Sequence, residues 1–187
     1  MPPSPNAANK NPRMQKYTTL ITELDAAIAA AADHHRHRLQ CRPGCSDCCK
    51  SFSVLAVEAA AMQQALAKLA PPIRARIGDA ATQQAEQCPF LLDDLCAIYQ
   101  YRPMICRSQG LAIAYIDHEL EAIEVSACPR NFPAEEEYPF SEEDLLFMDP
   151  FNDRLAGINL DFCVEKELSP AERIHFRAIA ETTSDLF

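Results

Sequence analysis

The sequence lacks the features that mark membrane-spanning and nucleic-acid-binding proteins. Its most apolar segment, residues 26–32, has only seven residues and is mostly alanine, whereas a membrane-spanning helix needs about 20. Basic side chains are in the minority, with 17 Lys and Arg against 27 Asp and Glu and a net charge of −10. Nucleic acids and anionic membranes require clustered positive charge. We therefore expect neither a nucleic acid nor a membrane as a partner.

Glycine is also scarce, and an export signal is not evident. The four glycines, Gly44, Gly78, Gly110 and Gly157, are unpaired, so the chain has no glycine-rich nucleotide loop following a strand. Residues 1–17 contain four prolines and three asparagines but no apolar run, unlike a secretory signal. The sequence thus predicts a cytoplasmic protein, in which thiols stay reduced. In that compartment, the nine cysteines are expected to act as metal ligands and not to form disulfides. The alternative is an exported domain that is stabilised by disulfides.

Hydrophobic periodicity predicts a mainly helical domain. Apolar residues recur at helical spacing from Met14, and further helical patterns cover residues 55–69 and 72–87. Two later helices are expected after Ser141 and after Ser169, each of which could act as an N-cap. Asp93-Asp94 predicts a turn between Cys88 and Cys96. Alternation at residues 111–115 and 123–125 predicts a small β-hairpin. We expect a flexible tail at residues 1–13 and one domain at 14–187, mainly α with a cysteine-rich metal-binding knot and a small β-hairpin, α+β at most.

Four cysteines fall within nine residues: Cys41, Cys45, Cys48 and Cys49. The Cys45-x2-Cys48 spacing allows two thiolates to reach one metal ion, and the Pro43-Gly44 turn allows Cys41 to approach them. Cys48 and Cys49 are adjacent, so their side chains are expected to diverge. Two arrangements remain open: a single site with an accessory thiol, or a cluster or binuclear centre that uses both.

A second set of cysteines follows at wider spacing: Cys88, Cys96, Cys106 and Cys128. A second Cys-x2-Cys is absent, unlike in zinc ribbons, so a bound metal would close long loops and contribute directly to folding. All-thiolate ligation favours zinc, an iron–sulfur cluster or cuprous copper. We rank the candidate ligands as Cys45, Cys48, Cys96 and Cys106, followed by Cys41, Cys49, Cys88 and Cys128. Cys163 stands alone among apolar residues, as a buried structural thiol does.

Two arginines and three histidines are further candidates. Arg102 and Arg107 could donate hydrogen bonds to sulfur and neutralise a negative thiolate site, and ordinary ion pairs explain them equally well. His34, His35 and His37 could ligate a metal. The preferred interpretation of these histidines is a polar helix end that complements the helix dipole.

The cysteine pattern resembles a known family. The relevant motifs are Cys41-x3-Cys45-x2-Cys48-Cys49, then Cys88-Pro-Phe-Leu, then Cys96-x-Ile-Tyr-x2-Arg-Pro-x2-Cys106-Arg107, and a later Cys128. Over residues 41–128 they resemble the bacterial YkgJ-like cysteine-cluster proteins, a family described by eight cysteines and by zinc or iron chelation. The resemblance implies that these eight cysteines bind metal. Cys163, the ninth cysteine, lies outside the pattern. Related cysteine clusters occur in flagellin lysine N-methylases.

These observations predict a cytoplasmic protein that chelates zinc or iron, or holds an iron–sulfur cluster, through eight cysteines. Its expected partners are the metal ion and an unidentified protein. The alternative is an enzyme, or a component of one, related to protein lysine N-methylation and using a cysteine-held cluster. The lack of a glycine-rich methyl-donor loop weighs against catalysis by this chain alone.

Overall fold

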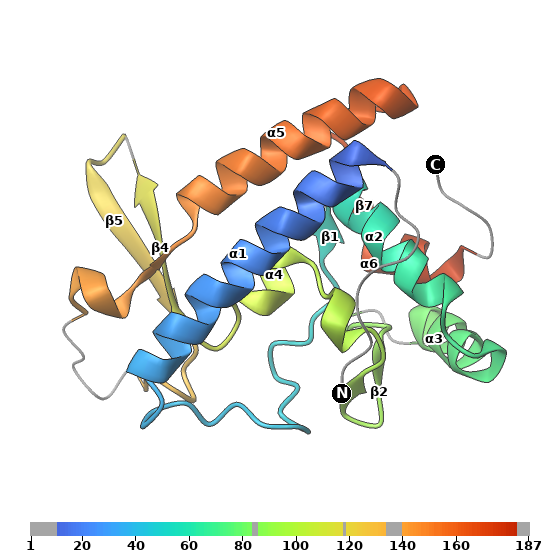
Figure 1. The fold of residues 1–187 in the computed structure, drawn as a ribbon. Helices are drawn as coiled ribbons and strands as arrows, with labels where there is room; N and C mark the ends of the chain where they lie inside the picture. Colours follow the sequence, from blue (N-terminus) through green and yellow to red (C-terminus); the bar gives the residue numbers. More distant parts are fainter. Residues whose placement is uncertain (1–10, 84–85, 118, 134–139, 183–187) are drawn as a thin grey trace.

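The computed structural model describes residues 11–83, 86–117, 119–133 and 140–182. Two long helices, α1 (Pro12–His34) and α5 (Asp149–Lys166), lie side by side across the molecule (Figure 1). With α2 (Ala56–Ala67) they enclose a first hydrophobic core, in which Leu20, Val57 and Phe162 are almost completely buried. The helical stripe predicted from Met14 onward is therefore the buried face of α1.

A second hydrophobic core lies on the other side of α2. It is formed with α3 (Pro71–Gln83) and α6 (Phe176–Glu181), and its centre contains Met62, Ile77 and Phe176. Four cysteine side chains border this core: Cys49, Cys88, Cys96 and Cys106. The second core thus extends to four of the nine cysteines.

Three small sheets complete the fold. Strands β4 (Ala112–Asp117) and β5 (Ala122–Ala127) form the predicted antiparallel hairpin, and β6 (Leu146–Phe147) pairs in parallel with β4. Strand β1 (Ser53–Val54) pairs with β7 (Ile174–His175), and β2 (Leu91–Leu92) pairs with β3 (Leu95–Cys96). Short turns η1 (Tyr99–Tyr101) and η2 (Glu142–Asp144) and helix α4 (Met104–Arg107) connect them. The predicted fold class, mainly α with small β elements, is confirmed.

The start of α1 differs slightly from the prediction. Asn11 is its N-cap and accepts a hydrogen bond at Oδ1 from the Arg13 backbone nitrogen at 2.8 Å, and Pro12 occupies the first turn. Both residues are favourable there, so the helix begins two residues before Met14. Residues 1–10 of the predicted tail lie outside the described residues. The helix ends at His34, so His37 lies beyond it.

The two predicted C-terminal helices begin at other places. Ser141 does form a capping box with Asp144, but the box closes only the single turn η2. Pro150 does not interrupt a helix; it lies in the first turn of α5, where its missing N–H has no cost. The last helix begins at Phe176 and not after Ser169, because residues 174–175 are paired with β1.

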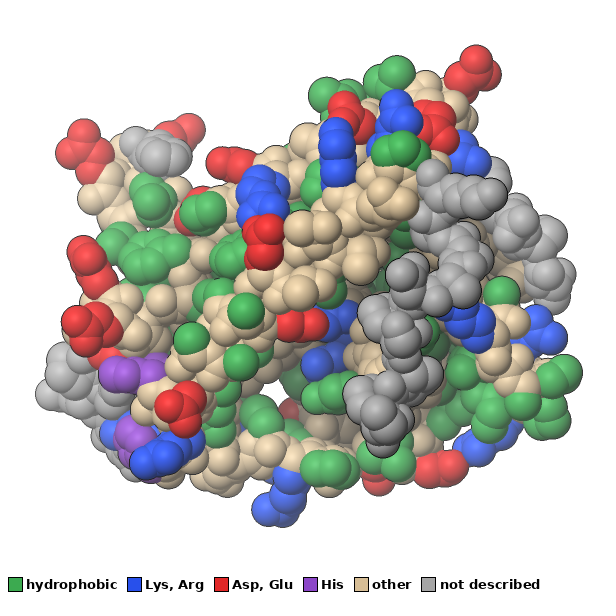
Figure 2. Space-filling model, in the orientation of Figure 1, with side chains coloured by type: hydrophobic (Ala, Val, Ile, Leu, Met, Phe, Trp, Pro, Cys, Tyr) green, Lys and Arg blue, Asp and Glu red, His purple; other side chains and the backbone are tan. Residues whose placement is uncertain are grey.

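The described surface agrees with the charge of the sequence. Figure 2 shows acidic and basic side chains interspersed on the visible face, without a large basic patch there. Within the described segments, each helix is too short or too polar to cross a membrane.

Candidate metal centre

Backbone pairing brings the first cysteine segment to the second. Residues 49–51 lie against residues 86–88: the Cys88 nitrogen donates to the Cys49 carbonyl at 3.2 Å, and the Ser51 nitrogen donates to the Glu86 carbonyl at 3.0 Å. A bridge between Lys50 and Gln87 lies between these bonds. The pairing places Cys49 and Cys88 next to each other although 38 residues separate them in the chain.

A tight hairpin then adds Cys96. Strands β2 and β3 pair in a register that sets Leu91 opposite Cys96. The turn between them consists of Asp93 and Asp94, both with positive φ of 51° and 60°, a conformation that Asp tolerates better than most residues. The predicted turn at these aspartates is therefore confirmed, and it directs the chain from Cys88 back to Cys96.

Backbone N–H groups point at two of these sulfurs. The Cys88 sulfur accepts hydrogen bonds from the nitrogens of Phe90 and Leu91, and the Cys96 sulfur accepts one from Ile98. Such bonds stabilise a thiolate and orient it, as outer-shell contacts do around bound metals. The backbone around these two sulfurs thus favours their ionised form.

Glu58 positions the fourth thiol of this region. Its carboxylate, 3% exposed, accepts a hydrogen bond from the Met104 nitrogen at 2.9 Å and another from the Leu55 nitrogen at 3.2 Å. It therefore ties the start of α2 to α4, the one-turn helix that carries Cys106. Burial raises the pKa of Glu58. The sequence motifs gave no sign of this residue, because a buried acidic side chain on an apolar helix face is visible only in three dimensions.

We call the four thiols at the second core the inner cysteines: Cys49, Cys88, Cys96 and Cys106. They lie close enough to perturb one another. Burial raises the pKa of Cys88 to about 12, and it also raises the pKa of Cys96 and of Cys106. Ionisation of one thiol opposes ionisation of its neighbours, so only a cation could hold all four as thiolates.

The other four thiols, which we call the outer cysteines, are Cys41, Cys45, Cys48 and Cys128, and each is exposed or half-buried. Asn131 joins two of their segments. Its side chain accepts from the Gln40 nitrogen at 2.8 Å and donates to the Gly110 carbonyl at 2.6 Å, and it lies 3.4 Å from the Cys41 sulfur. The Asn131 nitrogen donates to the Cys128 carbonyl at 3.0 Å. One asparagine thus brings Cys41 to the loop of Cys128.

Two of the outer cysteines line an open pocket of about 250 Å³. Cys48, Cys128 and Gly110 line it, and a Cβ on Gly110 would lie only 2.8 Å from the Cys41 sulfur. Arg130, at the rim, forms an ion pair with Asp47 and interacts electrostatically with Cys45 as well as with Cys128. All four outer thiols therefore lie on or beside one solvent-accessible hollow.

Cys48 and Cys49 connect the two groups. Their thiols lie close enough to influence each other's ionisation. The Cys49 side chain raises the pKa of Cys48, and the Cys48 side chain lowers the pKa of Cys49. The four thiols ranked first by spacing are therefore divided between the two groups. Cys96 and Cys106 are inner cysteines, and Cys45 and Cys48 are outer cysteines.

The two candidate arginines have different surroundings. Arg102 lies 3.8 Å from the Tyr99 ring centre and donates to the Cys106 carbonyl at 3.3 Å. Burial raises the pKa of Cys96 and Cys106, and the Arg102 guanidinium partly offsets this effect. Arg107 instead forms a two-pronged ion pair with Asp25 at 2.7 Å. Its remaining bonds go to the carbonyls of Arg102 and Gln100, so it fixes the segment that carries Arg102.

The last cysteine and the histidines lie apart from both groups. Cys163 is completely buried in the first core, as its isolation among apolar residues predicted. His34 and His35 contact Asp144 at the end of α1, and His37 is exposed beyond that helix.

The donor set fits a thiophilic metal. Each group offers four sulfurs, and the inner group also has backbone N–H donors to sulfur and a nearby guanidinium. Among the described residues, no three of the sulfurs lie within 4.8 Å of one another. A bound metal would thus require rotation of cysteine side chains, while the backbone could keep its course.

Comparison with known proteins supports metal chelation by the cysteine-rich segment. No curated protein and no solved structure matches the chain significantly. Residues 40–129 match the model of a family described as CxxCxxCC, "putative zinc- or iron-chelating domain". That segment contains all inner and outer cysteines and excludes Cys163. The match at residues 40–129 confirms the resemblance that the cysteine motifs predicted.

Proposed function

We propose that the protein binds two metal centres, one through the inner cysteines and one through the outer cysteines. The observation that carries the proposal is the division of eight thiols into two groups of four, with the adjacent residues Cys48 and Cys49 contributing one thiol to each. Four thiolates complete the coordination of zinc or of one iron–sulfur cluster. The division therefore assigns a full ligand set to each group.

The inner centre has the character of a closed, structural site. Its ligands would be Cys49, Cys88, Cys96 and Cys106, which lie on three separate chain segments next to the second core. Metal bound there would close long loops, so its binding free energy would contribute to folding. Arg102 would offset the negative charge of four thiolates, and Arg107 would act through Arg102.

The outer centre has the character of an exchangeable site. Cys41 and Cys48 are exposed, and the pocket beside them opens to solvent. A metal ion there could be taken up from, or passed to, a partner without unfolding the protein. We propose zinc or iron handling in the cytoplasm as the role of this centre.

Metal and sulfide analysis of protein purified without oxygen tests this proposal, together with an absorption spectrum. We expect about two metal centres per chain. Zinc without visible absorption would identify both as thiolate–zinc sites, whereas iron with acid-labile sulfide and broad visible absorption would identify a cluster. A protein that contains no metal, and does not take any up after its thiols are reduced, would contradict the proposal.

A further inference from the structure

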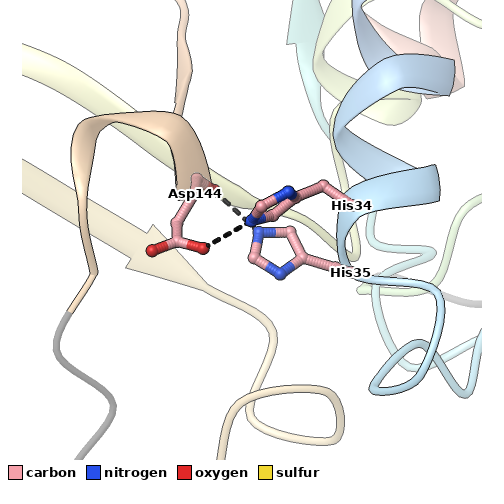
Figure 3. Close-up of side chains that lie close together, drawn as sticks. All are labelled: His34, His35 and Asp144. Atoms are coloured by element: carbon pink, nitrogen blue, oxygen red, sulfur yellow. Dashed lines mark hydrogen bonds and ion pairs between the residues drawn. The ribbon is translucent and has the colours of Figure 1, made fainter.

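A second kind of ligand set lies at the end of α1, where Figure 3 shows His34, His35 and Asp144 pointing toward one another. His34 is the last residue of the helix, and His35 is its C-cap. The His34 Nε2 lies 2.9 Å from the Asp144 Oδ1, and the His35 Nε2 lies 2.8 Å from the Asp144 carbonyl oxygen. One ligand atom from each residue falls within 4.8 Å of the other two. In the described part of the chain, no other His, Cys, Asp or Glu group meets this criterion.

The surroundings hold these side chains in place. The other Asp144 carboxylate oxygen, Oδ2, accepts hydrogen bonds from the Ser141 nitrogen at 2.7 Å and from the Ser141 hydroxyl at 2.8 Å, which directs Oδ1 toward His34. The His35 ring is 1% exposed and packs edge-on against Phe132, with 5.1 Å between ring centres. A carboxylate fixed by its second oxygen and an imidazole fixed by packing are typical supports of metal ligands.

We propose that His34, His35 and Asp144 form a separate metal site that takes a divalent transition metal, with zinc as the natural probe. Two imidazoles and one carboxylate form a common zinc ligand set, and they leave one position open. On binding, the metal replaces the two Nε2 protons, which move to the Nδ1 atoms of the same rings. The ligands become two neutral imidazoles and one carboxylate, so the divalent cation and its three ligands together carry a net charge of +1.

Access and location suit such a site. The His34 side chain is 49% exposed and that of Asp144 is 10% exposed, so a metal can enter from solvent and still contact a sheltered carboxylate. Figure 2 shows histidine side chains at the surface in this region. The segment of residues 128–132 also reaches the outer cysteines, because Phe132 contacts His35 and Asn131 contacts the Cys41 sulfur. The nitrogen–oxygen site therefore lies on the same side of the molecule as the proposed exchangeable centre.

The competing explanation is a metal-free latch that joins α1 to η2 through hydrogen bonds alone. His34→Gln separates the two, because a glutamine amide can still donate to Asp144 but is a poor zinc ligand. His37→Gln is the matched control: His37 is an exposed histidine three residues away. Both variants keep all nine cysteines.

The test is a calorimetric zinc titration of the full chain after its thiols have been saturated with zinc and a weak chelator has removed the zinc that the cysteines do not hold. We expect the wild type and His37→Gln to bind one further zinc ion, and we expect His34→Gln to bind it at least tenfold more weakly. Equal binding by wild type and His34→Gln, or no further zinc bound by either, would overturn the proposal. The zinc retained after the first step, measured with thiol reactivity, reports on the cysteine centres independently, so failure of one proposal is distinguishable from failure of the other.

Discussion

Replacing Cys106 by serine is expected to remove one metal centre per chain and to lower the free energy of unfolding by about 3 kcal/mol or more. Structural zinc contributes roughly 10–16 kcal/mol of apparent binding free energy in small thiolate domains, so even partial loss of ligation has a large effect. The affected site is the inner one, because Cys106 borders the second core together with Cys88 and Cys96. Metal analysis together with urea unfolding measures both consequences.

Two controls make this prediction specific. Cys163→Ser changes a thiol that is completely buried in the other core, so its metal content is expected to equal that of the wild type. Cys128→Ser changes an outer cysteine, and we expect it to lose metal with a smaller loss of stability. Equal metal content in the Cys106→Ser and wild-type proteins would show that the inner cysteines are not ligands.

Removing the metal is expected to make the protein sensitive to alkaline pH. In the metal-free chain, burial raises the pKa of Cys88 to about 12 and raises the pKa of Cys96 and Cys106. An unfolded thiol titrates near pH 8.5. Each raised thiol therefore contributes its full stability below about pH 8.5 and loses it as the pH rises toward the folded value. At pH 10 the loss is about 2 kcal/mol for a single thiol such as Cys88.

Bound metal reverses this dependence, because it stabilises the thiolate form and competes with protons. Thermal unfolding at pH 7 and pH 10, with and without a strong chelator, provides the comparison. We expect a small shift in Tm between the two pH values for the metal-loaded protein and a large fall for the chelated one. Identical pH profiles with and without chelator would contradict metal ligation by the inner cysteines.

The cysteine motifs and the hairpins were predictable because their signals are local. The Asp93-Asp94 turn and the alternation around β4 and β5 depend on neighbouring residues, and both predictions are confirmed. The match of residues 40–129 to the CxxCxxCC family model was also predictable from cysteine spacing.

The division of the thiols was not predictable from spacing. It depends on the pairing of residues 49–51 with residues 86–88 and on Asn131, which contacts a cysteine 90 positions earlier. Neither contact has a local signature. The same limitation explains the misplaced last helix: Ser169 begins a good capping pattern, but the pairing of β7 with β1 delays the helix until Phe176. Tertiary contacts outweighed the local preference there.

The central claim is that eight thiols form two separate metal centres, and native mass spectrometry of the metal-loaded chain tests it most directly. The His34→Gln background restricts the count to metal held by thiols. We predict two metal centres in that parent chain, one after the further change Cys106→Ser, and one after Cys128→Ser instead. A single centre in the parent, lost equally from both variants, would show that the cysteines act as one site and would contradict the account.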